Sequence, residues 1–157
     1  QRDIIDKRRA ELLDTDRAWQ EIFERSARAT LLDKELPRDT LVRAAREIML
    51  YHLDLGWSDH LALMDDVRES IHLRAIARET PIDEFHRIAV REFKELAQRA
   101  VDNAVDTFNE VPIDADGAHL EEQGLARPSA TWTYMVSDNP LAGSGNSLLR
   151  GIGNIFR

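Results

Sequence analysis

Two carboxylate–imidazole pairs are the residues best suited to chemistry in this sequence. Glu69 precedes His72 by three positions, and Asp83 precedes His86 by three positions. Side chains three apart share one face of a helix, so an antiparallel helix pair could join both pairs as in di-iron carboxylate bundles. Such a site also needs a glutamate from each of two further helices, and the sequence predicts only one. Exposed ion pairs near helix ends are therefore favoured, and a helical-bundle metalloprotein is the alternative.

Other combinations of reactive residues are disfavoured by their spacing. Ser58, Asp59 and His60 are sequence neighbours, whose side chains point apart on a helix, so a nucleophilic triad is excluded. His52 lies eight residues before His60, roughly 12 Å along a helix, which is too far for one metal ion. The glycine-rich segments near the carboxyl end lack the lysine of a phosphate-binding loop. We expect both histidines in or beside the core, and ATP chemistry only outside this chain.

A short loop with two cations could bind a partner. It consists of Arg74, Ala75, Ile76, Ala77 and Arg78, an apolar side chain between two arginines. Loops carried on rigid elements are a frequent location of binding function. The residues alone support a contact surface and an ordinary solvated loop equally.

Hydrophobic periodicity predicts a long helix on each side of this loop. Apolar residues recur near a 3.6-residue period from Leu41 to Ile71 and again from Phe85 to Phe108. Because only residues 74–79 intervene, the two helices must pack as an antiparallel hairpin. Gly56 lies inside the first of them, where we expect it to permit close approach of a neighbouring helix.

Local signals mark the helix boundaries. Asp39 or Thr40 can cap the first long helix. Thr80, Pro81 and Asp83 resemble a capping box with proline at the first helical position, and Pro112 ends the second helix. Residues 2–29 look like one further helix whose weakest turn is 14–16, followed by a connector at 30–38. Trp19 and Trp57 are expected to be packing anchors.

The carboxyl-terminal region, residues 111–157, changes character. Its Pro, Gly and Ser content predicts an irregular tail that buries too little apolar area to offset chain entropy. Thr131 to Val136, which includes Trp132 and Tyr134, predicts one strand that needs a sheet edge from elsewhere. The predicted fold class is thus all-α, with a tail that contributes at most one strand.

Composition narrows the possible functions. The 157 residues carry a net charge of −8, which argues against a nucleic-acid-binding face. Cysteine is absent, so disulfides and thiolate metal sites are excluded. No stretch approaches the ~20 apolar residues of a spanning helix. Because the chain opens inside a helical pattern without Met, we expect a piece of a larger protein.

The segment from Leu53 to Pro81 closely resembles the two-helix finger of SecA, the bacterial ATPase that drives preproteins through the Sec channel. The residues that carry this resemblance are Trp57, His60, Leu61, Met64, Asp65, Arg68, Ile71, His72, Leu73 and Arg74. The resemblance extends over residues 1–110 and is strongest from 50 to 108. It implies a helical scaffold domain at 1–110, divided into a scaffold helix (1–30), a truncated wing connector (31–40) and the finger (41–110). Residues 111–157 would form a linker and tail.

The resemblance also implies partners. The finger tip, Arg74 to Arg78, would contact the Sec channel, SecY, and the translocating preprotein, and the helices would couple them to motor domains elsewhere in the parent protein. Trp132 and Tyr134 would dock the tail on another domain. ATP and Mg would act in the parent protein, whereas this chain would bind no cofactor or metal. The expected location is the cytoplasm, peripherally at the inner face of the plasma membrane, and a homodimer is compatible with the family. A non-catalytic helical adaptor remains an alternative.

The tip differs from the usual SecA pattern at Ile76, which stands where the family usually carries a bulky residue, often tyrosine. Two other departures point to one branch of the family. The interval from Thr30 to Leu41 leaves little room for the wing, and no Cys is present for a terminal zinc module. These features, with the segment ARPSATWTYMVSDNPL, are similar to the accessory SecA group of high-G+C Gram-positive bacteria.

Overall fold

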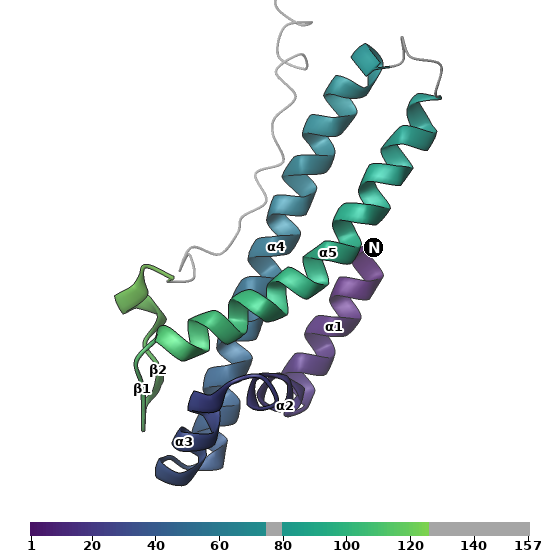
Figure 1. Cartoon of the computed structure of the whole chain (residues 1–157). Helices are drawn as coiled ribbons and strands as arrows, with labels where there is room; N and C mark the ends of the chain where they lie inside the picture. Colours follow the sequence, from purple (N-terminus) through teal and green to yellow (C-terminus); the bar gives the residue numbers. More distant parts are fainter. Residues whose placement is uncertain (75–79, 126–157) are drawn as a thin grey trace, which may run out of the picture. The chain divides into compact units, whose positions relative to one another are not determined.

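The computed structural model describes residues 1–74 and 80–125, and the side chains of residues 72–74 are outside the description. Helices dominate this part of the chain, which confirms the predicted all-α class (Figure 1). The elements in order are α1 (Arg2–Asp14), α2 (Arg17–Phe23), α3 (Ala27–Glu35), α4 (Arg38–Arg74), α5 (Pro81–Glu110), β1 (Ile113–Asp114), β2 (Gly117–Ala118) and the 3-10 helix η2 (Leu120–Gln123).

The long helices α4 and α5 form the predicted antiparallel hairpin. They contain 37 and 30 residues and lie side by side, with the end farthest from α2 projecting past the three shorter helices (Figure 1). At ~1.5 Å per residue, α4 is about 55 Å long. Helix α4 begins at Arg38, so Asp39 and Thr40 lie in its first turn and the predicted cap at either residue is wrong. The carbonyl of Pro37 instead accepts hydrogen bonds from the amides of Thr40 and Leu41.

The single helix predicted for residues 2–29 is wrong, because the structure contains three helices there. Thr15 is extended and ends α1, and its hydroxyl donates to the carbonyl of Glu11 and accepts from the amide of Arg17. Such local side-chain hydrogen bonds compete with a helix ladder. Ser26 precedes α3 and caps its amino end, since its hydroxyl accepts a hydrogen bond from the amide of Ala29. The residues expected to form a connector at 30–38 are therefore mostly helical.

Two arginines donate hydrogen bonds to the carboxyl ends of helices that are distant from them in the sequence. Arg46 on α4 donates to the carbonyls of Leu12 and Thr15 at the end of α1, at 2.9 and 3.0 Å. Arg28 on α3 donates to the carbonyls of Phe108 and Val111 at the end of α5, both at 2.8 Å. The last carbonyls of a helix have no partner within it, and a cation there also suits the helix dipole. These contacts stabilise the carboxyl ends of α1 and α5.

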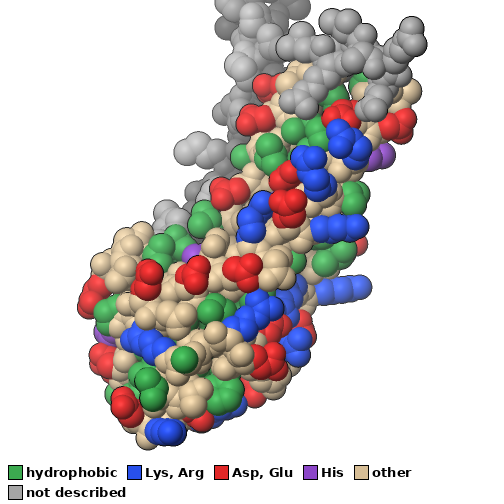
Figure 2. Space-filling view, in the orientation of Figure 1, with side chains coloured by type: hydrophobic (Ala, Val, Ile, Leu, Met, Phe, Trp, Pro, Cys, Tyr) green, Lys and Arg blue, Asp and Glu red, His purple; other side chains and the backbone are tan. Residues whose placement is uncertain are grey.

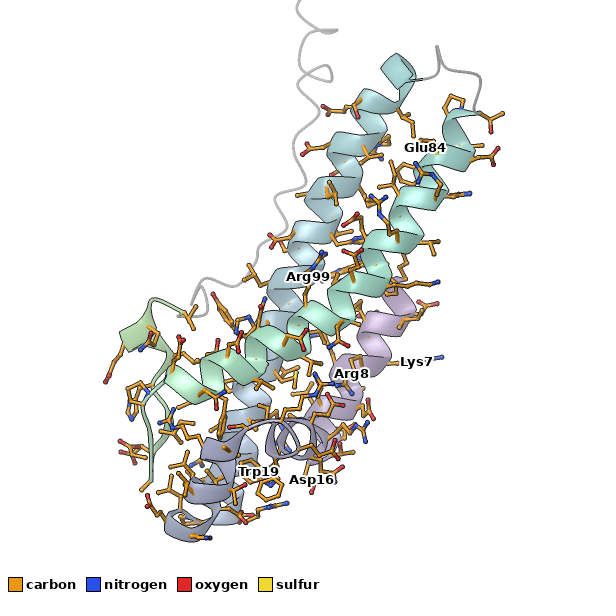
Figure 3. The ribbon with its side chains drawn as sticks, viewed as in Figure 1. Lys7, Arg8, Asp16, Trp19, Glu84 and Arg99 are labelled. Atoms are coloured by element: carbon orange, nitrogen blue, oxygen red, sulfur yellow. The ribbon has the colours of Figure 1, made fainter. Side chains whose placement is uncertain are left out.

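The main hydrophobic core lies where α1, α2 and α3 pack around the base of the hairpin. Trp19 on α2 is fully buried at this end of the molecule (Figure 3), with its ring centroid 6.0 Å from that of Phe108 on α5. This confirms Trp19 as a packing anchor. The largest fully buried side chains are Trp19, Phe108, Leu12, Ile22, Leu41, Ile48, Met49 and Val111.

Charged hydrogen bonds connect α1 to its neighbours. The Glu21 carboxylate on α2 accepts from Arg8 at 2.6 Å and from Arg17 at 2.8 Å, and Figure 3 labels Arg8 on α1. Burial alone would raise the pKa of Glu21, but the two guanidinium groups hold it below its ordinary value. Arg9 forms an ion pair with Asp54 on α4, in which Nη2 donates a hydrogen bond of 3.0 Å to one carboxylate oxygen and Nε lies 2.8 Å from the other. Helix α1 is thus tied both to α2 and to the hairpin.

The first part of the predicted irregular tail is ordered, so that prediction is wrong for residues 111–125. Strands β1 and β2 pair antiparallel across a tight turn in which Asp114 accepts from the amide of Asp116 at 2.8 Å. Gly117 has φ of 128°, a conformation that favours glycine. Val111 and Leu120 are buried in the main core. The strand predicted at 131–136 lies outside the described residues.

Candidate functional site at the end of the hairpin

A small hydrophobic cluster joins α4 and α5 near the end of the hairpin. Val67 and Ile71 on α4 pack with Ile88 on α5, and Met64 and Phe85 lie against them half-buried. We call these five side chains the distal cluster. It is separate from the main core at the base. The end of the hairpin is therefore positioned by few apolar contacts, on two continuous helices.

Helix α5 starts at the predicted position. Pro81 is its first residue, and the extended Thr80 precedes it. The hydroxyl of Thr80 donates to the Asp83 carboxylate, while the Thr80 carbonyl accepts from the amides of Asp83 and Glu84. The pair therefore stabilises the helix start through its side chains, whereas a capping box would use the backbone amides. This start fixes the direction in which the chain leaves the loop.

The predicted tip residues lie at and beyond the limit of the description. Arg74 is the last residue of α4, and its side chain is not described. Ala75, Ile76, Ala77 and Arg78 lie outside the described residues. Trp132 and Tyr134, predicted to dock the tail, also lie outside them. The roles of all seven residues remain predictions.

Aromatic and histidine side chains fill the interface midway along the hairpin. His60 is 5% exposed and stacks on Trp57 with ring centroids 5.6 Å apart. Its Nε2 lies 3.1 Å from Oε1 of Gln1, whose amide nitrogen donates to the carbonyl of Ala89 on α5. His52 is 8% exposed and its Nε2 lies 2.7 Å from the hydroxyl of Thr107. Both histidines are core residues, as predicted, although Nδ1 of His52 has no partner among the described residues.

The stability of the chain should fall as the pH decreases below about 6.5. Burial lowers the pKa of His52 and of His60, so the unfolded chain takes up protons at these side chains at a higher pH than the folded chain. Their contribution is complete above the unfolded pKa and is lost as the pH falls toward the lower folded values. Urea unfolding should therefore have a lower midpoint at about pH 5.5 than at about pH 7.5.

His119 has the opposite effect on the pH dependence of stability. The hydrogen bond from its ring to Asp114, 2.8 Å long, raises the pKa of His119. Its stabilising contribution is therefore present at low pH and is lost as the pH rises through the raised value. Replacing His119 with Gln should steepen the pH dependence, whereas replacing His52 with Gln should weaken it. Equal midpoints at both pH values in the unchanged chain would contradict this account.

A cavity of about 260 Å³ lies between α4 and α5 beside these rings. Gly56 borders it, and Figure 3 shows Arg99 at the same junction of the two helices. The other lining residues are His52, Leu55, Asp59, His60, Leu63, Glu92, Leu96, Ala100 and Asn103. The mixture of carboxylates, a guanidinium and leucines makes this a partly polar layer between the main core and the distal cluster.

Replacing Gly56 with Ala should raise the free energy of unfolding by about 0.5 to 1 kcal/mol. A Cβ at this position would lie 3.5 Å from Cγ of Leu96, an ordinary contact, so α5 approaches closely but leaves room for a methyl group. Urea unfolding followed by circular dichroism measures the change. The reverse replacement at exposed Ala62 on the same helix should lower stability by a similar amount. A loss of stability in Gly56→Ala would show that the contact is tighter than the structure indicates.

Comparison with known families decides among the interpretations of this hairpin. The family model described as the SecA Wing and Scaffold domain matches residues 15–111, more than half of the chain. The chain belongs to the SecA family. The resemblance predicted from residues 53–81 is therefore confirmed.

Similar SecA proteins match the chain along its whole length. It is 73% identical over 157 residues to protein translocase subunit SecA 2 of Corynebacterium efficiens and 69% identical over 158 residues to that of Corynebacterium diphtheriae. It is 50% identical over 161 residues to SecA 2 of Mycolicibacterium smegmatis. The alignments cover 100% of this chain but 21%, 21% and 20% of the relatives. The chain thus spans about a fifth of the length of the curated relatives it matches.

The alternative metal site of this SecA chain gains no support from the described residues. Within residues 1–74 and 80–125, no group of three or more His, Asp or Glu side chains could hold a metal ion. Glu69, Asp83 and His86 are exposed to solvent. The His72 side chain is not described, so the four-residue combination stays a prediction. Among the described helices, none has both the length and the apolar composition needed to cross a membrane.

One surface of this SecA hairpin was missed by the sequence interpretation. Arg87, Arg91 and Lys94 lie on the outside of α5 at positions i, i+4 and i+7, where helical spacing aligns them. This spacing is visible in the sequence, but cations at helical spacing are also typical of an ordinary solvated helix face. The terminal carbonyl contacts of Arg28 and Arg46 had no sequence signal, because each joins residues more than thirty positions apart.

Proposed function

We propose that the chain forms the helical scaffold and two-helix finger of an ATP-driven protein translocase, in which the tip between α4 and α5 meets the Sec channel and the translocating preprotein. The observation that supports this proposal is the long antiparallel hairpin, which projects past the shorter helices and lies within the residues matched by the SecA Wing and Scaffold model (Figure 1). A stiff projection of this kind presents a loop far from the base that holds it.

The contacts of α1 suggest how motion reaches the hairpin. Arg9 pairs with Asp54 on α4, and the Gln1 side chain contacts His60 on α4 and the Ala89 carbonyl on α5. A displacement of α1 would therefore act on both hairpin helices. In this proposal, ATP turnover with Mg occurs in motor domains elsewhere in the parent protein and moves α1. The hairpin then carries the motion to Ile76.

The tip and the tail have separate roles in the proposal. Arg74 and Arg78 would donate charge-assisted hydrogen bonds to acidic or carbonyl groups at the channel mouth, SecY, or on the preprotein. Trp132 and Tyr134 would add a strand to a sheet edge of a motor or preprotein-binding domain. The parent protein would work in the cytoplasm at the inner face of the plasma membrane, and a homodimer is compatible with this arrangement.

Site-specific photo-crosslinking from position 76 tests the proposal. The probe is placed in the full-length parent protein, with membranes, ATP and a preprotein present. A matched probe replaces Lys7, which is exposed on α1 away from the tip (Figure 3). Adducts from position 76 to the channel or to the preprotein are expected, without the same adducts from position 7. Absence of such adducts, with normal yields from position 7 to other proteins, would favour a helical adaptor instead.

A further inference from the structure

The side chain of the residue before α1 bridges the two long helices. The backbone carbonyl of this residue, Gln1, accepts hydrogen bonds from the amides of Ile4 and Ile5 in the first turn of α1. Its side-chain nitrogen donates to the carbonyl of Ala89 on α5 at 3.0 Å, and its Oε1 lies 3.1 Å from Nε2 of His60 on α4. Ala89 and His60 are both buried. We call the contact of Gln1 with these two residues the Gln1 clamp.

The direction of both hydrogen bonds follows from their donors and acceptors. A backbone carbonyl can only accept, so the amide nitrogen of Gln1 must face Ala89 and the amide oxygen must face His60. Because the amide oxygen is an acceptor, His60 carries a proton on Nε2. The ring keeps this proton in the neutral form with Nε2–H and in the protonated form. Protonation of His60 therefore leaves the hydrogen bond of the clamp in place.

The imidazole ring that the clamp contacts is packed between α4 and α5. His60 stacks on Trp57 with an interplanar angle of 24°, and its ring centroid lies 5.7 Å from that of Phe93 on α5. Trp57 and Phe93 also meet edge to face, with centroids 6.3 Å apart. Ala89, the second partner of Gln1, directly follows Ile88 of the distal cluster. The clamp thus holds α1 against the part of the hairpin next to the distal cluster.

The charged contacts between α1 and the hairpin are less suited to hold this position. Arg9 and Asp54 form an ion pair in which both side chains are 42% exposed. Acidic and basic side chains lie side by side over much of the visible face (Figure 2), and exposed pairs contribute little and are screened by salt. Arg46 joins α4 to α1 at the base of the hairpin. Breaking the Gln1 clamp, in contrast, leaves the buried Nε2–H of His60 without its acceptor, which is costly.

We propose that the Gln1 clamp controls the opening of the distal end of the hairpin. The engaged clamp holds α4 and α5 together beside the distal cluster, and displacement of α1 breaks both hydrogen bonds and frees that end. The distal cluster has few apolar contacts of its own, so two hydrogen bonds are a large share of what keeps this end closed. This inference rests on the proposed function, in which ATP turnover moves α1. Gln1 is a positioning residue in this account, because it acts on the tip through α4 and α5.

Hydrogen exchange of the full-length parent protein, with and without ATP, tests the clamp. The variant Gln1→Met keeps the length of the side chain and removes both hydrogen bonds. Amides near Ile88 and Val67 should then exchange at least about fourfold faster, since each lost bond shifts a local opening equilibrium by about twofold or more. Amides near Ile48 in the main core should be unchanged. The same substitution at exposed Gln20 on α2 is the matched control, and it should change exchange near Ile88 less than about twofold.

The response to ATP separates control of opening from a structural contact. ATP should speed exchange near Ile88 in the unchanged protein and should have no such effect in Gln1→Met, whereas loss of a structural contact would leave the ATP effect in place. The proposal would be overturned by an ATP effect that Gln1→Met retains in full, by no ATP effect in the unchanged protein, or by faster exchange throughout the main core.

A second variant tests the hydrogen bond to His60 directly. His60→Phe keeps a ring against Trp57 and Phe93 but has no donor for the amide oxygen of Gln1. In this background, Gln1→Met should speed exchange near Ile88 at most about half as much as it does in the unchanged protein, because one of the two bonds is already lost. An equal effect in both backgrounds would show that the two side chains do not act together and would overturn the proposal.

Crosslinking from position 76 separates failure of this inference from failure of the proposed function. Normal adducts from position 76, with no change of exchange in Gln1→Met, would remove the clamp and leave the finger. Absent adducts, with the expected exchange differences, would remove the contact of the tip with the channel and leave the clamp.

Discussion

Replacing Trp19 with Ala is expected to lower the free energy of unfolding by about 3 to 5 kcal/mol. The Trp19 side chain is fully buried, with its ring centroid 6.0 Å from that of Phe108 and 5.3 Å from that of Phe23. The guanidinium carbon of Arg38 lies 4.9 Å from the centre of the indole ring. Removing the indole would leave a large cavity where α2 meets the hairpin. Its nitrogen has no hydrogen-bond partner among the described residues, so the loss is one of packing.

Urea unfolding of the chain, followed by circular dichroism, measures this loss. Phe23 provides the matched control, because it touches the same ring but is 37% exposed. The change Phe23→Ala should cost less than half as much as Trp19→Ala. Similar losses in both variants would contradict the view that burial at position 19 dominates. If the cooperative urea transition disappeared while the helical circular-dichroism signal remained, the variant would be in a loosely packed state.

Replacing Ile76 with Gly should reduce preprotein transport by the full-length protein about tenfold or more. In the proposed finger, Ile76 supplies the apolar contact at the tip, and burying such a side chain contributes about 1.5 to 3 kcal/mol. Helicity and basal ATP hydrolysis should be unchanged, because position 76 falls in the sequence between the last residue of α4 and the first residue of α5. Transport into membrane vesicles, circular dichroism and ATP hydrolysis in solution measure the three properties.

The matched control for Ile76 is Ala77→Gly. It introduces the same backbone freedom beside the same loop but removes only one methyl group. Transport by this variant should stay within about fourfold of the unchanged protein, the effect of a contact of ~0.8 kcal/mol or less. A loss equal to that of Ile76→Gly would show that the added backbone freedom reduces transport, and that the Ile76 side chain has no specific role. Equal loss of transport, helicity and hydrolysis would argue against any specific role of the tip.

The hairpin could be predicted from the sequence because its signals are local. The 3.6-residue periodicity, Thr80 and Pro81 before α5 and Pro112 after it act on neighbouring residues. The weak turn at 14–16 was visible in the sequence, but the complete break between α1 and α2 could not be predicted, since Arg46 on α4 also stabilises it. The order of residues 111–125 likewise depends on burying Val111 and Leu120 against distant helices. A pattern of single residues does not encode such contacts.

The candidate site was predicted only in part for a related reason. Family resemblance indicated the loop and its helices, and the family is confirmed over residues 15–111. Arg87, Arg91 and Lys94 on α5 are common residue types at common spacing, so the sequence did not distinguish them from an ordinary solvated face. The low exposure of the Glu84 and Glu92 carboxylates that pair with Arg87 and Arg91 depends on the folded structure, and the sequence does not show it.

The separation of the distal cluster from the main core has a consequence for local unfolding. Amides near Ile88 and Val67 are protected by few apolar contacts, whereas those near Ile48 and Phe108 belong to the large core. Hydrogen exchange should therefore proceed by opening from the loop end of the hairpin, while amides at the base exchange only when the whole unit unfolds. The hairpin would then combine a base that stays folded until the whole unit unfolds with an end that opens and recloses. In the proposed finger, such an end would adapt to successive segments of the translocating polypeptide without disturbing the base that supports it.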